Sequence, residues 1–455
     1  MANPTAAPAA SQSVSDSGLK RVLGLPSLVL FGLVYMVPLT VFTTYGIVAQ
    51  VSGGRVPLAY LVTLAAMVFT ARSYGLMSRA FPFAGSAYTY TQRSFGPGIG
   101  FLAGWALMLD YLFLPMINYL VIGIYMGAAF PAVPSWIFIV AAIALVTVLN
   151  VVGIVSVARA NFVILALQAV FIVVFIALSI GAISGSGTVD LLAPFSGTGD
   201  PGGLAPVLAG AAILCLSFLG FDSVSTLAEE TRDPKKMVPK AIMLTTVSAG
   251  ILFVVLSYVG HLVLPSHEFT DVDSAALDVM AVSGGQFLAA FFTAAYVAGC
   301  IGSALASQAS VSRILFAMGR DKVLPSGFFG RINRRFGTPV LAILTVSVIS
   351  LFALFIDLGL LAEMISFGAL IAFSVVNLSV VKHYFLGEKQ RQGAANLINN
   401  LIVPLIGFAL VIWLWTSLSS RTLIVGLIWL AIGFIYLLVI TRGFRRQTPM
   451  LELKD

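Results

Sequence analysis

Charged residues are scarce in this chain of 455 residues: Asp, Glu, Lys and Arg together make up 9% of it. A soluble domain carries about 25% charged residues, because its whole surface faces water. Hydrophobic residues make up 59% of the chain, and its mean hydropathy is +1.02. These values exclude a soluble globular protein. The long apolar runs instead predict helices of about 20 residues that cross a membrane.

Cysteine is also scarce, and the alternating segments of about ten residues that mark a membrane β-barrel are missing. Cys215 and Cys300 are the two cysteines, and both lie inside apolar runs without metal-type spacing. We therefore expect no disulfide framework, no metal site and no cofactor. The predicted fold class is an all-α polytopic membrane protein.

Charged and Gly- or Pro-rich breaks divide the apolar runs into twelve predicted spans. The spans cover residues 26–49, 57–78, 99–130, 134–153, 161–184, 205–228, 239–264, 282–312, 339–357, 360–384, 399–418 and 421–441. With the N-terminus inside, 23 of the 25 Lys and Arg residues fall in cytoplasmic segments, and only Arg55 and Arg421 fall outside. Positive residues favour cytoplasmic loops, so we predict that both termini are cytoplasmic.

The same charge distribution explains the net charge of +7. A positive inner rim faces anionic lipid, so no nucleic acid partner is needed to account for it. We expect a disordered cytoplasmic tail at residues 1–19, a transporter domain at 20–446 and a second cytoplasmic tail at 447–455.

Two spans contain residues that break helices at mid-depth. In the first span the break covers Tyr35, Met36, Val37, Pro38 and Thr40. Proline lacks an amide donor and disfavours helix at the residue before it, here Val37. Pro38 taken alone is also compatible with a simple packed kink.

The sixth span has a matching break from Ser217 to Ser223, which includes Phe218, Gly220, Phe221 and Asp222. Interrupted segments at corresponding positions of two halves are typical of an inverted-repeat transporter whose site lies at the midplane. We therefore predict repeats at about 20–184 and 205–384, each with five spans, followed by two extra helices at about 399–441.

Two carboxylates lie at depth in the predicted spans. Asp110 is about twelve residues into the third span, roughly 18 Å along it. A carboxylate there is either a functional group or a structural acid that hydrogen bonds to a broken helix neutralise. The same two interpretations apply to Asp222. Tyr111 and Asn118 share another face of the third span, where they either line a cavity or join helices.

Three further candidate residues lie in or near the sixth-span break. Phe221 lies inside the break, and we expect it to contact the substrate. Glu229 and Glu230 lie at the inner end of the span next to Arg232, where they form either a solvated ion pair or an inner gate.

Several segments resemble the amino acid, polyamine and organocation (APC) superfamily, and among its members the bacterial putrescine importers. They are Gly85 to Tyr90 (GSAYTY), Leu109 to Asn118 (LDYLFLPMIN), Ser217 to Asp222 (SFLGFD), Glu229 to Thr231 (EET), Met318 to Asp321 (MGRD) and Phe367 to Leu370 (FGAL). The resemblance implies the leucine-transporter-type fold, alternating access, proton-driven uptake and the bacterial inner (plasma) membrane. It also implies that the first, third, sixth, eighth and tenth spans line the site, which adds Tyr296 of the eighth span to the candidates.

Three positions depart from the family's patterns. Met36-Val37-Pro38 stands where many amino acid permeases have a Gly-Ser-Gly-type break that receives a substrate carboxylate. Thr43 stands where putrescine importers have an Asp. Gln168 matches the fifth-span Lys of many proton-coupled relatives, and a Gln cannot take up a proton at physiological pH. Asp110 or Asp222 must therefore carry the proton.

The sequence thus predicts a proton-coupled importer of a small organic amine such as putrescine or a related polyamine or monoamine. The alternative is a proton-coupled amino acid permease, and remote alternatives are a transporter-like nutrient sensor and an intramembrane aspartyl protease. The predicted partners are the amine or amino acid, protons and the lipid bilayer, and the chain is expected to be a monomer and not an enzyme. The candidate substrate-binding residues are Tyr35, Met36, Val37, Pro38, Thr40, Thr43, Asp110, Tyr111, Asn118, Phe218, Gly220, Phe221, Asp222 and Tyr296; those for proton coupling are Asp110, Asp222 and Gln168, and those for gating are Phe221, Glu229 and Glu230.

Overall fold

The structure is a computed structural model, which describes residues 21–83, 86–153, 157–185, 189–197, 203–266, 268–320, 324–333, 335–443 and 445. The predicted tails at 1–19 and 447–455 lie outside these residues, as do Gly85 and Asp321 of the motifs quoted above. The described residues form helices, with one isolated bridge and no named strand. The predicted all-α class is therefore confirmed.

The main α-helices are α1 (Leu25–Met36), α2 (Tyr45–Ser52), α3 (Val56–Ala80), α4 (Ser86–Phe95), α5 (Pro97–Ala129), α6 (Ser135–Val152), α7 (Val157–Gly185), α9 (Ala205–Leu214), α10 (Pro234–Val263), α11 (Ala276–Arg320), α12 (Val340–Ser350), α13 (Leu358–Val380), α15 (Val403–Thr416) and α16 (Ser420–Ile440). Shorter elements are the α-helices α8 (Ala193–Ser196) and α14 (Ala394–Leu397), the 3-10 helices η1 (Pro38–Phe42), η2 (Cys215–Phe218), η3 (Ser223–Glu230) and η4 (Leu351–Leu354), and the π-helices η5 (Val381–Gly387) and η6 (Ile398–Ile402).

Eleven helical segments of the described chain are long and apolar enough to cross a membrane. The predicted span at 339–357 corresponds to α12 with η4, Val340–Leu354, which is apolar but shorter than the about 20 residues that a straight span needs. The count of twelve and the cytoplasmic termini therefore stay predictions. The helix α4 was not predicted, because it is too polar and short to be read as a span.

The predicted break of the first span is present at Val37. This residue has φ 54° and ψ 101°, which ends α1, and Pro38 then opens the 3-10 helix η1. A positive φ is unfavourable for a β-branched residue, so the surrounding helices must hold Val37 in place. Pro38 has no amide hydrogen, so it cannot carry the helical hydrogen-bond ladder across this point.

The predicted break of the sixth span is present at Leu219 and Gly220. α9 tightens into η2, Leu219 is extended, and Gly220 has φ 130° before η3 begins. A residue with a side chain rarely adopts that φ, which explains why glycine occupies the position. The two breaks meet, because a Cβ on Gly220 would lie 2.8 Å from the Tyr35 ring and 3.2 Å from the Met36 amide nitrogen.

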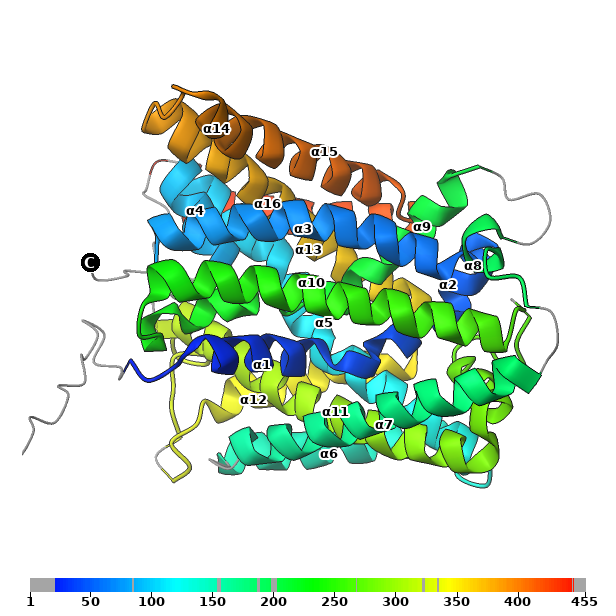
Figure 1. The fold of residues 1–455 in the computed structure, drawn as a ribbon. Helices are drawn as coiled ribbons and strands as arrows, with labels where there is room; N and C mark the ends of the chain where they lie inside the picture. The colour runs from blue at the N-terminus through cyan, green and yellow to red at the C-terminus, as the bar shows by residue number, and fades with distance from the viewer. Residues whose placement is uncertain are drawn as a thin grey trace, which may run out of the picture.

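Helices at equivalent places in the two predicted repeats pack against each other (Figure 1). α3 packs along α10, which are the second and seventh predicted spans, and α5 packs along α11, the third and eighth. This pairing is the one that a two-fold relation between the repeats would produce. The repeat boundaries themselves stay predictions.

Of the last two long helices, α15 packs against α3 and α13, and α16 packs against α5 and α13. On α16, the Trp429 indole nitrogen donates to the carbonyl of Trp105 on α5, and the Trp105 indole nitrogen donates back to the carbonyl of Trp429, both at 2.9 Å. The two rings stack with centroids 5.0 Å apart. This reciprocal pair satisfies both indole donors inside the bundle.

The start of the described chain is tied to the segment between η3 and α10. The amides of Val22 and Leu23 donate to the Glu230 carbonyl at 2.9 and 3.0 Å, and the Arg232 amide donates to the Leu23 carbonyl at 3.1 Å. Leu23 and Thr231 form the parallel bridge. The chain ahead of α1 is therefore connected to the end of the sixth span.

Candidate functional site

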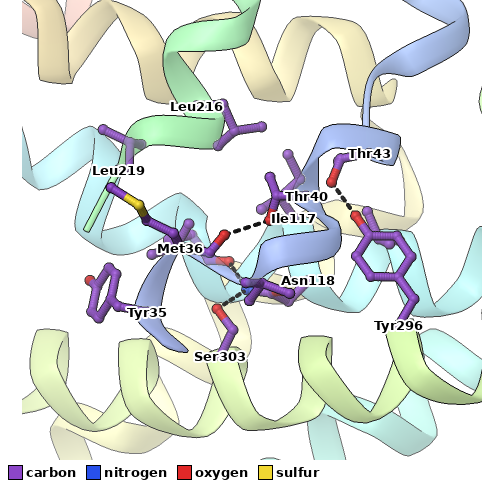
Figure 2. A pocket seen from close by; sticks show the side chains of 13 residues that line it. Tyr35, Met36, Thr40, Thr43, Ile117, Asn118, Leu216, Leu219, Tyr296 and Ser303 are labelled. Carbon is purple, nitrogen blue, oxygen red and sulfur yellow. Dashed lines mark hydrogen bonds between the residues drawn. The ribbon is translucent and has the colours of Figure 1, made fainter. Parts of the chain in front are cut away.

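A central cavity lies beside the break of the first span, with about 390 Å³ free of atoms (Figure 2). Its walls come from α1 and η1, α5, the broken sixth span and α11. The residues that line it are Tyr35, Met36, Val37, Thr40, Thr43, Leu114, Ile117, Asn118, Val121, Leu216, Leu219, Tyr296 and Ser303. The wall is thus mixed: seven of these residues have apolar side chains, and six carry a hydroxyl or an amide.

The polar groups of the central cavity are bonded to one another. The Thr40 hydroxyl donates to the Met36 carbonyl at 2.6 Å, and the Thr43 hydroxyl is hydrogen-bonded to the Tyr296 hydroxyl across the two spans. Asn118 bridges from α5 to Ser303 of α11. Figure 2 shows these side chains converging on the same space.

An aromatic layer closes the cavity on the predicted outer side. Tyr125 donates from its hydroxyl to the Phe42 carbonyl at 2.9 Å, and its ring lies 5.3 Å from the rings of Phe292 and Tyr296. Phe42 also contacts Phe292 edge to face at 5.4 Å. These residues follow Thr40 along η1 and Asn118 along α5, which places the layer beyond the cavity.

Asp110 and Asp222 lie on the predicted inner side of the cavity and line neither it nor the second cavity described below. Asp110 precedes the lining residues of α5 by about one turn, and Asp222 follows Leu219 of the sixth span. Both side chains are buried, and they are close enough to interact electrostatically. Each also interacts with the hydroxyls of Tyr35 and Tyr111, so the four groups form an acid cluster.

The two carboxylates of this acid cluster differ in their hydrogen bonds. The Gly220 amide donates to Asp222 Oδ1 at 3.3 Å, so Asp222 supports the backbone at the break. Asp110 Oδ1 is buried and has no hydrogen-bond partner among the described residues. Two ionised carboxylates in one water-poor cluster repel each other strongly, which favours a proton or a cation between them.

Tyr35 belongs both to the acid cluster and to the wall of the central cavity. It lines the cavity and interacts with both acids. Its ring rests on Gly220, where a Cβ would come within 2.8 Å of it. A ligand that passes from the cavity to the acids must therefore displace Tyr35 or the backbone that supports it.

Other predicted residues lie away from both cavities. Phe221 packs against Tyr74 and Phe373 at 5.5 and 5.2 Å between ring centroids, and Phe218 packs against Phe253 at 5.4 Å. Both phenylalanines are fully buried in these clusters. In this conformation, therefore, Phe221 does not face the central cavity.

The inner acids Glu229 and Glu230 are half-buried at the end of η3, which is the place that the sequence predicted. The carbonyl of Glu230 receives the two amides of the N-terminal segment. These contacts join the segment before α1 to the inner end of the broken sixth span. A gating role for the two acids stays a prediction.

A second, smaller cavity of about 230 Å³ lies behind the first break, between α1, α7 and α11. Pro38 and Gln168 line it, together with Val34, Ile164, Leu165, Gly299 and Gly302, and it shares Val37 and Ser303 with the central cavity. Gln168 Nε2 packs directly against Gly299, and a Cβ on Gly299 would collide with it. The predicted Gln168 thus lies next to the break and not in the central cavity.

Sequence reasoning missed six residues that line the central cavity: Leu114, Ile117, Val121, Leu216, Leu219 and Ser303. The first three continue the face of Asn118 at helical spacing, so that spacing could have found them. Leu216 directly precedes the predicted break of the sixth span, and Leu219 lies inside it. Ser303 carries no sequence signal of its own, since small hydroxyl residues are common in membrane helices.

A bundle of membrane-length helices in which two broken helices meet at one enclosed cavity defines a membrane transporter. The chain matches the family described as "Amino acid permease" over residues 27–443, and it belongs to that family. It is therefore a transporter of amines or amino acids and not an enzyme, which removes the aspartyl protease alternative.

Among its relatives, the chain is 41% identical to the "Low-affinity putrescine importer PlaP" of Escherichia coli (strain K12), over 95% of this chain and 96% of that one. It is 27% identical to the "Branched-chain amino acid permease BcaP" of Bacillus subtilis (strain 168), over 94% of each chain. It is 28% identical to the "Methylthioribose transporter" of the same organism, over 93% of this chain and 94% of that one.

The fold is similar to that of MhsT, solved in complex with L-phenylalanine, with a TM-score of 0.60 at 13% identity. The match covers 86% of this chain and 98% of MhsT. It confirms the predicted leucine-transporter-type fold. Together with the family and the membrane-length helices, it confirms a multi-pass protein of the inner membrane.

Proposed function

We propose that this chain is a secondary active importer of a small organic amine, such as putrescine or a related polyamine or monoamine. It takes up the amine together with a proton and works by alternating access. The observation that carries the proposal is the acid cluster of Asp110 and Asp222, which lies directly behind the central cavity where the two broken helices meet.

The charge balance at the centre of the bundle supports a cationic substrate. The described residues that line the two cavities include no Lys, Arg or His, whereas two carboxylates lie next to Tyr35. A substrate carboxylate would meet these charges without a counter-ion, but an ammonium group would neutralise one of them. The similarity to a protein named as a putrescine importer points in the same direction.

Coupling to protons is assigned to Asp110. Its Oδ1 atom has no hydrogen-bond partner in the part of the chain that the structure describes, and a buried carboxylate in that state gains most from taking up a proton or a cation. Asp222 already accepts the Gly220 amide and is the second candidate. Gln168 cannot serve, because a Gln side chain does not titrate.

A proton-coupled amino acid permease is the second candidate function. The similarity to a branched-chain amino acid permease favours it, as do the apolar residues on one part of the cavity wall, among them Leu114, Leu216 and Leu219. An amino acid would still have to place its carboxylate near the first break, where Pro38 has no amide to offer.

The test is uptake of radiolabelled putrescine into proteoliposomes with an acidic exterior. We expect uptake that depends on the pH gradient and that unlabelled amines inhibit more strongly than unlabelled leucine. Inhibition by leucine with no inhibition by any amine would replace this proposal with the amino acid permease. Uptake that persists after a protonophore removes the gradient would refute proton coupling.

A further inference from the structure

The side-chain amide of Asn118 is held in one orientation. Its Nδ2 atom donates to the Leu114 carbonyl at 2.8 Å and to the Ser303 hydroxyl oxygen at 3.1 Å. A backbone carbonyl can only accept a hydrogen bond, so the atom facing Leu114 must be the NH₂ group and not the oxygen. Both amide hydrogens are therefore used inside the protein.

The remaining polar atom of this amide, Oδ1, receives no hydrogen bond from the described residues, although Asn118 lines the central cavity. Thr40, on the opposite wall, has donated its only hydroxyl proton to the Met36 carbonyl. Two polar groups of the cavity can therefore only accept hydrogen bonds. The hydroxyls of Thr43, Tyr296 and Ser303 can still donate or accept.

We propose that Asn118 binds an N–H group of the substrate through Oδ1, and that Ser303 is the positioning residue that keeps the amide in this orientation. The proposal rests on the proposed function, because it needs a substrate with an ammonium group. It names the residue that selects for this group inside the cavity, before the substrate reaches Asp110 and Asp222.

The physical basis is the cost of leaving a buried polar group unpaired, since Asn118 is only 7% exposed. An ammonium donates to Oδ1 and satisfies it, and a hydrogen bond to a charged group is stronger than a neutral one. A carboxylate in the same place presents lone pairs to an acceptor and leaves both groups unpaired. A residue that is neutral overall can thus discriminate by the sign of the substrate's charge.

Three substitutions test this assignment, together with a matched control. Asn118→Leu keeps the size of the side chain but removes the acceptor. Ser303→Ala removes one anchor and leaves an amide hydrogen facing the cavity, and Ser303→Thr retains the hydroxyl. The control is Ser307→Ala. Ser307 lies one turn further along α11 and lines neither cavity, and its hydroxyl donates to the Ser303 carbonyl at 2.7 Å.

The measurement is the KM for putrescine uptake into proteoliposomes, with competition by unlabelled putrescine and by unlabelled leucine. For Asn118→Leu we expect KM to rise about 10-fold to 100-fold, the value of one charge-assisted hydrogen bond. For Ser303→Ala we expect a rise of about fivefold and stronger competition by leucine relative to putrescine. Ser303→Thr and Ser307→Ala should stay near the wild type.

Two further outcomes separate the two proposals. If the wild-type protein takes up putrescine but Asn118→Leu and Ser303→Ala leave its KM and the competition ratio at the level of Ser307→Ala, the role of Asn118 is refuted and the proposed function stands. If no amine is taken up or competes in the wild type, both proposals fail. The apparent melting temperature of each purified variant identifies any variant that misfolds. If Asn118→Leu misfolds, the result for Ser303→Ala decides the test.

Discussion

Replacement of Gly220 by alanine tests whether the close contact between the two broken helices is required for transport. Gly220 has φ 130°, and a Cβ there would lie 2.8 Å from Tyr35 Cδ1 and 3.0 Å from Met36 Cγ. Carbon atoms normally approach to about 3.5 Å, so the Tyr35 ring must move by about 0.7 Å or more. Tyr35 is the side chain that the central cavity and the acid cluster share.

The expected cost has two parts. A residue with a side chain at this φ costs about 1–3 kcal/mol, and the forced displacement of a packed ring costs about 1–3 kcal/mol more. We therefore expect Gly220→Ala to be less stable by about 2–6 kcal/mol and to lose at least about 90% of its uptake. Uptake into proteoliposomes and the apparent melting temperature in detergent are the two measurements.

The matched control is Gly53→Ala. Gly53 also has a positive φ, 63°, but no atom of the described residues lies within 4 Å of the Cβ position. That substitution should cost about 1–2 kcal/mol of backbone strain and leave the KM for uptake unchanged. If Gly220→Ala transports as well as Gly53→Ala and melts at the same temperature, the contact between the breaks does not control transport.

Three other substitutions have defined outcomes. Asp110→Asn should abolish proton-dependent uptake without lowering the apparent melting temperature, because it removes a buried charge whose Oδ1 is unpaired; retained proton-dependent uptake would contradict the coupling role. Burial, and then the nearby Asp271, raise the pKa of Asp273 in the loop before α11, so its ionised form destabilises the fold. At pH values above this raised pKa, Asp273→Asn should therefore increase the melting temperature. The gain should vanish as the pH falls below the ordinary carboxyl pKa of about 3.9, and a gain independent of pH would refute this. Trp429→Phe removes one of two reciprocal hydrogen bonds and should cost about 0.5–1.5 kcal/mol in thermal denaturation; an unchanged melting temperature would show that the pair is not structural.

The sequence predicted those parts of the fold that depend on local chemistry. Pro38 lacks an amide hydrogen wherever it stands, and Gly220 permits a φ that other residues avoid, so both breaks could be located before the structure. The depth of Asp110 followed from its distance along an apolar run. These properties need no knowledge of neighbouring helices.

The shape of the cavity could not be predicted in the same way. Phe221 was expected to contact the substrate because it lies in the break, but its ring turns toward Tyr74 and Phe373. Ser303 lines the cavity although nothing in the sequence distinguishes it from other small hydroxyl residues of the spans. Which side of a broken helix faces the cavity depends on the helices packed against it, and a single sequence does not contain that information directly.

The length of the ninth predicted span was also beyond local reasoning. The apolar run at 339–357 is long enough to suggest a span, yet α12 and η4 end at Leu354. Hydropathy measures the polarity of a run, whereas the residue at which a helix stops depends on the hydrogen bonds available at its end.

The bond between the chain start and the segment that follows the sixth span has a practical consequence for spectroscopy. Three backbone hydrogen bonds join Val22 and Leu23 to Glu230 and Arg232, so replacing an exposed side chain such as that of Val22 does not remove them. A pair of spin labels, one on each of the two segments, would report a short distance while these hydrogen bonds are formed. The distance would be longer whenever this end of the bundle opens. A bulky fusion placed close before Val22 would change the balance between the hydrogen-bonded and the open arrangement of these segments. An affinity tag at the other terminus is therefore the safer design.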